Sequence, residues 1–381
     1  MNVAQVVNID ALRQLAKQRL PRLVFDYIDG GAEDEVGLAR NRGAFHDIQL
    51  LPRYLVDVSQ RDQTTTLLGR RYGAPFGIGP TGLAGFARPG ADLMLADAAV
   101  AANIPFVLSG AGTASIEAVA KRAPQHTWYQ LYVSRDTQIT ADLVRRARDA
   151  GIETLMLTVD VPVHGKRERD MRNGFVPPVK PTASALLNML GHPRWLMDML
   201  RHGLPRFENW APYAAAGASA KELGAFFASQ IPFTQTWHDL DTLRQLWPGK
   251  LVIKGLLHPA DAQRALDAGA DGIIVSNHGG RQLDSAPTSV DVFPAIRAQI
   301  GRRLSLMLDG GVRRGADIVK AKALGADFVF VGRAPMYGVA SGGLAGAQRA
   351  IAILCDEIDM TMAQIGAAQM ADVNADRVWR R

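Results

Sequence analysis

The sequence predicts an α/β fold in which eight βα units close into a (β/α)8 TIM barrel, with an N-terminal helical extension and a long insertion after the fourth strand. Eight short apolar runs alternate with alanine-rich helical stretches, which is the pattern of βα units. The runs are apolar on both faces, as in a parallel sheet that is covered on both sides. A doubly wound open sheet is the alternative.

The strands are predicted from the apolar runs, each followed by polar residues. They cover residues 75–79, 105–108, 128–133, 154–159, 251–254, 272–276, 304–308 and 328–331. Gly151, Gly269 and Gly325 stand where three of the intervening helices should end. Glycine favours the left-handed conformation that such an end requires. Eight such units are enough to close a barrel.

Two regions lie outside the eightfold pattern. Residues 1–74 form an N-terminal extension, in which Asp10 is expected to cap a first helix and a second helix follows Pro21. Residues 175–237 separate the fourth and fifth strands by far more than a usual connection and are predicted to be an active-site flap. The whole chain, 1–381, is interpreted as one domain whose barrel spans 75–365.

Composition fits a globular protein with a large core, since 48% of the residues are hydrophobic and 21% are charged. Cys355 is the only cysteine, which excludes an intramolecular disulfide and a thiolate metal cluster. It is interpreted as a packing residue in an apolar helix, and no metal site is predicted.

Charge and hydropathy limit the partners. Residues 1–20 mix polar and apolar side chains, so no secretion signal is predicted. The sequence contains no uninterrupted run of about 18 apolar residues, so no membrane-spanning helix is predicted either. The net charge of +6 favours anionic ligands, but the basic residues are scattered, so nucleic acid is not expected. A cytoplasmic location is the expectation.

Candidate catalytic residues follow the predicted strands, because the active site of this barrel lies at the C-terminal strand ends. His278 stands at the sixth strand end before two glycines, with Arg281 three residues on and Asp160 at another strand end. In this set His278 is a possible base, the Arg281 guanidinium group can bind a carboxylate, and the Asp160 carboxylate can orient the base. Lys254, at the fifth strand end, requires an anion or a ring acceptor if it is buried.

A phosphate site is predicted after strands seven and eight, the usual place in this architecture. Glycines there expose backbone N–H groups, and arginines grip phosphate oxygens. The residues are Asp309, Gly310, Gly311, Val312, Arg313, Gly332 and Arg333.

Two other functions fit these residues. Lys254 could form a Schiff base in an aldolase, or the protein could bind a phosphate ligand without catalysis. Tyr27, Tyr132 and Arg167 fit structural roles as well as functional ones.

The segment 276–284, Ser-Asn-His-Gly-Gly-Arg-Gln-Leu-Asp, resembles the active-site signature of the FMN-dependent 2-hydroxy-acid dehydrogenases and oxidases. The resemblance extends from the motif at 25–32 through 158–160 and 309–313 to Gly332 and Arg333. It implies that FMN is the cofactor and that a small 2-hydroxy acid is oxidised to a 2-oxo acid. A second acceptor must then reoxidise the flavin.

The resemblance also implies roles for the site residues. His278 would be the base, Asp160 would stabilise its protonated form, and Tyr132 would hydrogen-bond at the reacting carbon. The substrate would contact Tyr27, Tyr132, Arg167, His278 and Arg281. Lys254 would face flavin N1. The ring and ribityl chain would be held by Pro80, Thr81, Gly82, Ser109, Gln130, Thr158 and Ser276, and the tail by Asp309 to Arg313 with Gly332 and Arg333.

Within the family, residues 32–35, 55–59 and 79–83 look more like mandelate dehydrogenase than lactate dehydrogenase. Gly82, where oxidases of the family usually carry alanine, favours a dehydrogenase that passes electrons to a quinone-type acceptor. Residues 183–206 mix apolar and cationic side chains and predict peripheral contact with the inner face of the cell membrane. L-lactate dehydrogenase and a soluble oxidase remain alternatives, and a homotetramer is expected from the family.

Overall fold

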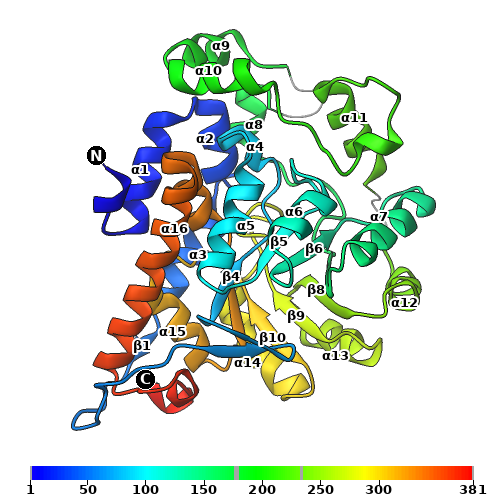
Figure 1. Cartoon of the computed structure of the whole chain (residues 1–381). Coiled ribbons are helices and arrows are strands. Elements are labelled where there is room, and N and C mark those ends of the chain that lie inside the picture. The colour runs from blue at the N-terminus through cyan, green and yellow to red at the C-terminus, as the bar shows by residue number, and fades with distance from the viewer. Residues whose placement is uncertain (1, 176–179, 232–234, 380–381) are drawn as a thin grey trace.

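Eight parallel strands form a closed barrel in the computed structural model, which describes residues 2–175, 180–231 and 235–379. Each of the eight predicted runs contributes one strand, so the prediction of a barrel is confirmed (Figure 1). Around the barrel the strands are β10 (Ser305–Leu308), β11 (Phe328–Val331), β4 (Phe76–Ile78), β5 (Phe106–Ser109), β6 (Thr127–Leu131), β7 (Thr154–Thr158), β8 (Lys250–Leu256) and β9 (Gly272–Val275).

The N-terminal end of the barrel is closed by side chains. A hairpin of β2 (Thr65–Leu67) and β3 (Arg70–Tyr72) places Tyr72 against Phe328, with ring centroids 5.7 Å apart. Above it Trp128 packs on Phe330 at 5.3 Å. These rings and the aliphatic side chains around them form a separate core inside the barrel. The opposite end, where the strands finish, is the one left for a ligand.

Helices cover the outside of the barrel (Figure 1). They are α5 (Ala91–Ala101), α6 (Ile116–Arg122), α7 (Thr137–Asp149), α12 (Trp237–Leu246), α13 (Pro259–Asp267), α14 (Ser289–Ile300), α15 (Gly315–Ala323) and α16 (Arg333–Gln364). Gly151, Gly269 and Gly325 have φ angles of 78°, 78° and 99°. The predicted glycine helix ends are therefore confirmed.

The N-terminal extension contains α1 (Ile9–Arg19), α2 (Arg22–Asp29) and α3 (Val36–His46). The prediction that Asp10 caps α1 was wrong, since Asn8 is the cap and its side chain accepts a hydrogen bond from the Ala11 N–H at 2.8 Å. Asp10 lies in the first turn, where it pairs with Arg42 at 3.3 Å. α2 begins directly after Pro21, as predicted.

The insertion after β7 forms its own layer of helices beside the C-terminal end of the barrel (Figure 1). After α8 (Glu168–Asn173) come α9 (Ala183–Leu190), α10 (Pro193–His202) and α11 (Ala220–Gln230). Two indole N–H groups fix this layer: Trp195 donates to the Phe86 carbonyl in α4 (Ala84–Ala87) at 2.7 Å, and Trp210 donates to the Gly110 carbonyl at 2.8 Å.

α16 is long and apolar enough to cross a membrane by length and composition, and it is the one such helix among the described residues. Most of its apolar window, 56%, is buried inside the protein, where α16 packs against α1, α5 and α15. We therefore interpret it as a core helix. Cys355 lies in it, partly buried against the core, consistent with a packing role.

Candidate active site

A buried lysine stands at the centre of the polar cluster at the C-terminal strand ends. Lys254 Nζ lies 3.3 Å from Asp309 Oδ2 and 3.8 Å from Asp160 Oδ2, and it donates to Ser276 Oγ at 2.9 Å. β8 continues to Leu256, so Lys254 lies within the strand and not at its end as predicted. Burial opposes its charge, but Asp309 and Asp160 together raise the pKa of Lys254 to about 12. The ammonium ion is therefore held permanently charged.

His278 is oriented by Asp160. Its Nδ1 lies 2.8 Å from Asp160 Oδ1, which leaves Nε2 as the nitrogen available to a ligand. Burial lowers the pKa of His278, so the imidazole is neutral near pH 7. Burial alone would raise the pKa of Asp160, but its interactions with His278 and with the Lys254 ammonium outweigh burial and the pKa is lowered. A neutral base beside a fixed carboxylate is suited to proton abstraction.

The backbone at His278 is held in an unusual conformation. Its φ of 56° is left-handed, and the next two residues, Gly279 and Gly280, have φ of 65° and 74°. The His278 N–H donates to Ser276 Oγ at 3.0 Å, which helps to hold this turn. Strain of this kind at a residue other than glycine is typical of functional sites.

Two guanidinium groups lie beside this base. Arg281 donates to the carbonyls of Tyr27 and Gly30 at 2.6 and 3.0 Å, and its guanidinium carbon lies 4.9 Å from the centroid of the Tyr27 ring. Arg167 donates to the Arg281 carbonyl at 3.3 Å. Burial and the charge of Arg281 lower the pKa of Arg167 to about 10. Two neighbouring, partly buried cations favour an anion such as a carboxylate between them.

Tyrosine hydroxyls complete this side of the cluster. Tyr27 donates to the Gly82 carbonyl at 3.3 Å. Tyr132 follows the end of β6, which stops at Leu131 and not at 133 as predicted, and burial raises its pKa to about 12. The Tyr132 hydroxyl is therefore a neutral hydrogen-bond donor near pH 7.

Several buried polar atoms at the strand ends have no partner among the described residues. They are Gln130 Nε2, Thr158 Oγ1, Asp309 Oδ1 and Arg313 Nε. An unsatisfied buried group costs about 1–3 kcal/mol, so such a set indicates a ligand with a polar edge. Gln130 is oriented for this by its Oε1, which accepts from Ser109 Oγ and the Gly110 N–H, both at 3.1 Å.

A second cationic region lies where β10 and β11 end. The Arg313 guanidinium carbon lies 5.7 Å from the centroid of the Tyr337 ring. Arg333 opens α16, with Gly332 as its N-cap, and donates to the carbonyls of Ile28, Gly30 and Gly279 at 2.9, 2.7 and 3.0 Å. Burial, with Arg281 and Arg313 nearby, lowers the pKa of Arg333 to about 9. Arginines at a helix N-terminus form an anion site.

Comparison with known proteins gives the family. The family model for FMN-dependent dehydrogenases matches residues 16–380. The chain belongs to this family. (S)-Mandelate dehydrogenase of Pseudomonas putida is 44% identical over 369 residues, 97% of this chain and 93% of the relative. L-Lactate oxidase of a Nostoc strain is 42% identical over 376 residues, 98% of both chains.

A solved structure described as the monotopic membrane protein (S)-mandelate dehydrogenase has the same fold, with a TM-score of 0.95 and 43% identity. It is matched over 99% of this chain and 100% of that chain. As a member of the FMN-dependent dehydrogenases, the protein is an FMN enzyme of 2-hydroxy-acid oxidation. The aldolase and the non-catalytic binder are thereby set aside.

The cluster fits FMN by its own chemistry. The unpaired atoms of Gln130, Thr158 and Asp309 match a flat ligand with donors and acceptors along its edge. The fixed charge of Lys254 suits a ring that becomes anionic on reduction. Arg313 and Arg333 supply positive charge for a phosphate.

The fold brings the other predicted residues to the same end of the barrel. Pro80, Thr81 and Gly82 follow β4, Ser276 follows β9, and the segment 309–313 follows β10. Gly310 and Gly311 have φ of 95° and 81°. A Cβ at Gly311 would collide with the Asn41 carbonyl of α3, so close packing against the N-terminal extension also requires this glycine.

No role was predicted from the sequence for several residues around the site. Asn277 and Asn41 exchange amide hydrogen bonds of 2.8 and 2.9 Å, which fix α3 to the His278 turn. Gln282 accepts from Arg167 and donates to the Asp160 carbonyl at 3.1 Å. Both Asn277 and Gln282 lie within the signature at 276–284, which was a usable signal. Nothing in the sequence singled out the neighbours of Tyr27: Ala111 and the aromatic residues Phe86 and Phe175.

Proposed function

We propose that the protein oxidises an aromatic (S)-2-hydroxy acid, such as (S)-mandelate, to the 2-oxo acid and passes the electrons to a quinone-type acceptor. The observation that carries this proposal is the neutral His278 held by Asp160, three residues before Arg281 and within reach of the charge of Arg167. A base and a carboxylate site at the same strand ends can act on the carbon next to a carboxylate.

In the proposed mechanism, Arg281 and Arg167 bind the substrate carboxylate with help from Tyr27. His278 removes a proton from the substrate through Nε2, and Asp160 stabilises the imidazolium that forms. Tyr132 forms a hydrogen bond with the substrate next to the carbon that reacts. When bound, FMN supplies a two-electron acceptor.

FMN would be held along the strand ends. Lys254 would lie at the N1 side of the ring, and the ring and ribityl chain would contact Pro80, Thr81, Gly82, Ser109, Gln130, Thr158 and Ser276. Asp309, Gly310, Gly311, Val312 and Arg313 would hold the tail and phosphate with Gly332 and Arg333. The unpaired polar atoms of Gln130, Thr158 and Asp309 support this arrangement.

The test is anaerobic bleaching of the flavin by the enantiomers of mandelate and lactate and by glycolate, followed by readmission of air. We expect (S)-mandelate to bleach the flavin fastest and the colour to return slowly in air, but quickly with a soluble quinone analogue. Fast bleaching by L-lactate alone would make the protein a lactate enzyme. If the colour returned quickly in air and hydrogen peroxide was formed, the protein would be an oxidase, like its relative in Nostoc.

An aromatic substrate is favoured by the aromatic and small residues around Tyr27. A Cβ built on Gly82 would lie 3.0 Å from Ala111 Cβ and 3.3 Å from the Tyr27 hydroxyl, so Ala111 and this hydroxyl both lie against Gly82. Phe175 packs edge-on to Tyr27 with ring centroids 5.3 Å apart, and Phe86 packs on Phe175 at 5.4 Å. Aromatic side chains beside a substrate-binding tyrosine suit a phenyl group in this space.

Substitution Ala111→Trp should therefore lower kcat/KM for (S)-mandelate by about 10–200-fold, the usual range for steric discrimination in an apolar pocket. The loss for L-lactate should be smaller, because its methyl group needs less of this space. Steady-state kinetics with both substrates measure the ratio, and Ala111→Ser is the matched control. Equal losses for both substrates would contradict an aryl pocket at Ala111.

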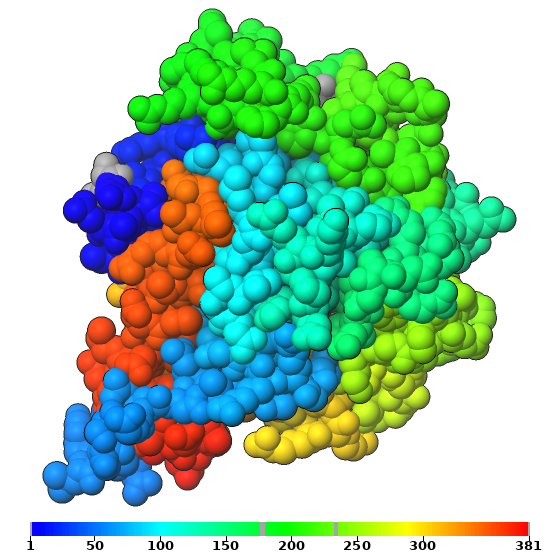
Figure 2. Space-filling model, viewed as in Figure 1, coloured from blue at the N-terminus to red at the C-terminus, as the bar shows by residue number. Residues whose placement is uncertain are grey.

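We further propose that α9 and α10 form a membrane-binding surface. Their exposed apolar side chains include Leu187 and Leu200, with 70% and 77% of their surface exposed, together with Leu186, Leu190 and Met197. Arg194 and Arg201 both lie on α10. Apolar and cationic side chains on one exposed surface suit an interface with anionic lipid. This layer is at the top of the molecule in Figure 2.

The holoenzyme should sediment with vesicles that contain anionic lipid, and the double variant Leu187→Asp/Leu200→Asp should bind them at least about tenfold more weakly, since two buried leucines contribute about 1.5–3 kcal/mol each. The control is Met360→Asp, which places a charge at an exposed apolar position of α16. If the double variant still sediments like the wild type, this surface is not the membrane contact.

A further inference from the structure

Two arginines of the candidate site are bound to the backbone at the C-terminal end of α2. Arg281 donates to the carbonyls of Tyr27 and Gly30 at 2.6 and 3.0 Å. Arg333 donates to those of Ile28 and Gly30 at 2.9 and 2.7 Å. The last carbonyls of a helix have no partner within the helix and lie at its negative end, so they suit cations. The Gly30 carbonyl is thus shared by an arginine proposed for the substrate carboxylate and one proposed for the flavin phosphate.

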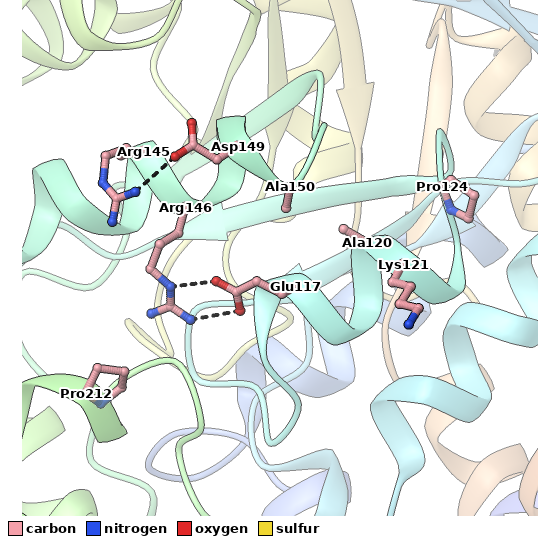
Figure 3. Close-up of a pocket in the computed structure, with 9 residues that line it drawn as sticks. All are labelled: Glu117, Ala120, Lys121, Pro124, Arg145, Arg146, Asp149, Ala150 and Pro212. Carbon is pink, nitrogen blue, oxygen red and sulfur yellow. Dashed lines mark hydrogen bonds and ion pairs between the residues drawn. The ribbon is translucent and has the colours of Figure 1, made fainter.

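These two arginines lack the carboxylate partner that other arginines of this protein have. Figure 3 shows the usual arrangement at the hollow between α6 and α7, where Arg146 makes two hydrogen bonds to Glu117, at 2.7 and 3.0 Å. In the part of the chain that the structure describes, neither Arg281 nor Arg333 forms an ion pair with a carboxylate. A guanidinium group held by carbonyls stays available to an anionic ligand, but its position then depends on the backbone that holds it.

Asp29, the last residue of α2, fixes this backbone. Its side chain is 5% exposed, and its two oxygens accept from Arg13 of α1 at 2.5 and 2.7 Å. The Tyr337 hydroxyl of α16 donates to it at 2.7 Å, and Arg169 of α8 lies 3.4 Å away. These three helices pack against α2 (Figure 1), and one carboxylate binds all of them to its C-terminal end.

The charge of Asp29 reaches the arginines of the predicted phosphate site. Burial would raise the pKa of Asp29, but the hydrogen bonds from Arg13 and Tyr337 outweigh it and lower the pKa to about 2. The carboxylate is therefore charged near pH 7, and its charge favours the protonated form of Arg333. The ring of Tyr337 also lies 5.7 Å from the guanidinium carbon of Arg313. Asp29 is thus connected to both arginines at the ends of β10 and β11.

We propose that Asp29 is a positioning residue for both anion sites. By fixing the end of α2 and the Tyr337 side chain, it holds Arg281 where the substrate carboxylate binds and Arg333 where the flavin phosphate binds. The proposal rests on the roles given above to these two arginines and adds a residue that acts through them. Because they share the Gly30 carbonyl, a displaced α2 weakens both sites together.

Comparison of FMN with riboflavin isolates the phosphate contribution, because riboflavin has the same ring and ribityl chain but no phosphate. The full chain is freed of flavin and titrated with each compound, and quenching of flavin fluorescence gives the two dissociation constants. In Asp29→Asn we expect FMN to bind about tenfold or more weakly, as for one lost charge-assisted hydrogen bond, and riboflavin to bind as in the wild type.

Two results of this titration would overturn the proposal. If Asp29 only stabilises the fold, both flavins lose affinity equally and the preference for FMN is unchanged. If the carboxylate acts only by offsetting the charge of Arg333, its removal increases the preference for FMN.

The substrate site is tested in the enzyme saturated with FMN, using the hydroxy acid that bleaches the flavin fastest. Asp29→Asn should raise KM by about tenfold and leave kcat within about twofold, because binding of the carboxylate is weakened while the His278 base is unaffected. An unchanged KM, or a loss confined to kcat, would show that Asp29 does not position Arg281.

Asp26→Asn is the matched control. Asp26 is a buried carboxylate on the same helix, but its hydrogen bonds come from Asn173 and Arg22, at 2.8 and 3.3 Å. This variant should lose stability in thermal unfolding and keep the wild-type preference for FMN and the wild-type KM. Losses as large as those in Asp29→Asn would assign the effect to α2 as a whole and end the assignment to Asp29.

Two further variants complete the test. Tyr337→Phe removes one hydrogen bond to Asp29 and keeps the Arg13 ion pair, so it replaces Asp29→Asn if that variant does not fold. It should lower the preference for FMN by about threefold or more, and an unchanged preference would contradict the proposal. Arg333→Lys should lower it by about tenfold or more. If Arg333→Lys has no effect, the phosphate site proposed above is wrong. If it has the expected effect and Asp29→Asn has none, only the role of Asp29 fails.

Discussion

Replacing His278 by glutamine is expected to lower kcat by about 10²–10⁴-fold, the contribution of a positioned general base. Glutamine fills a similar volume and keeps a polar end next to Asp160, but it cannot accept a proton. Anaerobic stopped-flow measurement of flavin bleaching isolates the step in which the base acts.

FMN content should stay normal in His278→Gln, because the proposed flavin contacts come from other residues. The control is His126→Gln, at the opposite end of the barrel, where His126 bonds to Asn103 at 3.1 Å. In the wild type, kcat/KM should fall only as the pH drops below the ordinary histidine value of about 6.5, because burial lowers the pKa of His278 and the base must be neutral to act. If the rate of flavin bleaching by substrate were unchanged in His278→Gln, the proposed mechanism would be contradicted.

Replacing Lys254 by methionine should destabilise the protein by about 3–5 kcal/mol and slow flavin reduction, because Asp160 and Asp309 would lose their shared cation in a buried site. Thermal unfolding of the apo and FMN-bound protein measures the first effect, and bleaching by substrate measures the second. The control Lys322→Met removes a partly buried lysine that donates to the Asp327 backbone carbonyl at 2.9 Å, which leaves no carboxylate unpaired.

The stability loss in Lys254→Met should depend on pH in a defined direction. In the wild type the pKa of Asp160 is lowered in the folded state, so its stabilising effect is present above the unfolded value of about 3.9 and is lost as the pH falls through the lowered value. Removing the cation raises the pKa of Asp160. The difference between variant and wild type should therefore be largest near neutral pH and shrink in acid, and a pH-independent difference would point to lost packing.

The barrel could be predicted from the sequence because its determinants are local. Each strand is a short apolar run, and Gly151, Gly269 and Gly325 mark helix ends by a conformational requirement of the residue itself. Element ends were less predictable: α1 is capped by Asn8 because its side chain, not that of Asp10, reaches the free N–H groups. β8 extends past Lys254 because β9 continues to pair with it, with Leu256 opposite Val275 after a register shift.

The candidate site was predictable where polar residues follow a strand, as for His278 and Asp160, which lie 118 positions apart and meet at 2.8 Å. Residues whose importance depends on tertiary packing were not. Ala111 carries no polar group and matters only because it lies against Gly82, as the Tyr27 hydroxyl does. Phe175 looks like any core phenylalanine until α2 places Tyr27 against it.

The aromatic side chains that fill the N-terminal half of the barrel, with Tyr72 beneath them, close that end of the barrel in the part of the chain that the structure describes. We therefore expect the hydroxy acid, the oxo acid and the electron acceptor to use the same opening at the C-terminal strand ends. If they use it in turn, oxidation of the substrate and regeneration of the enzyme are two separate half-reactions. The helices of the insertion stand beside that opening (Figure 1), where a lipid-dissolved acceptor would arrive from the same direction as the departing product.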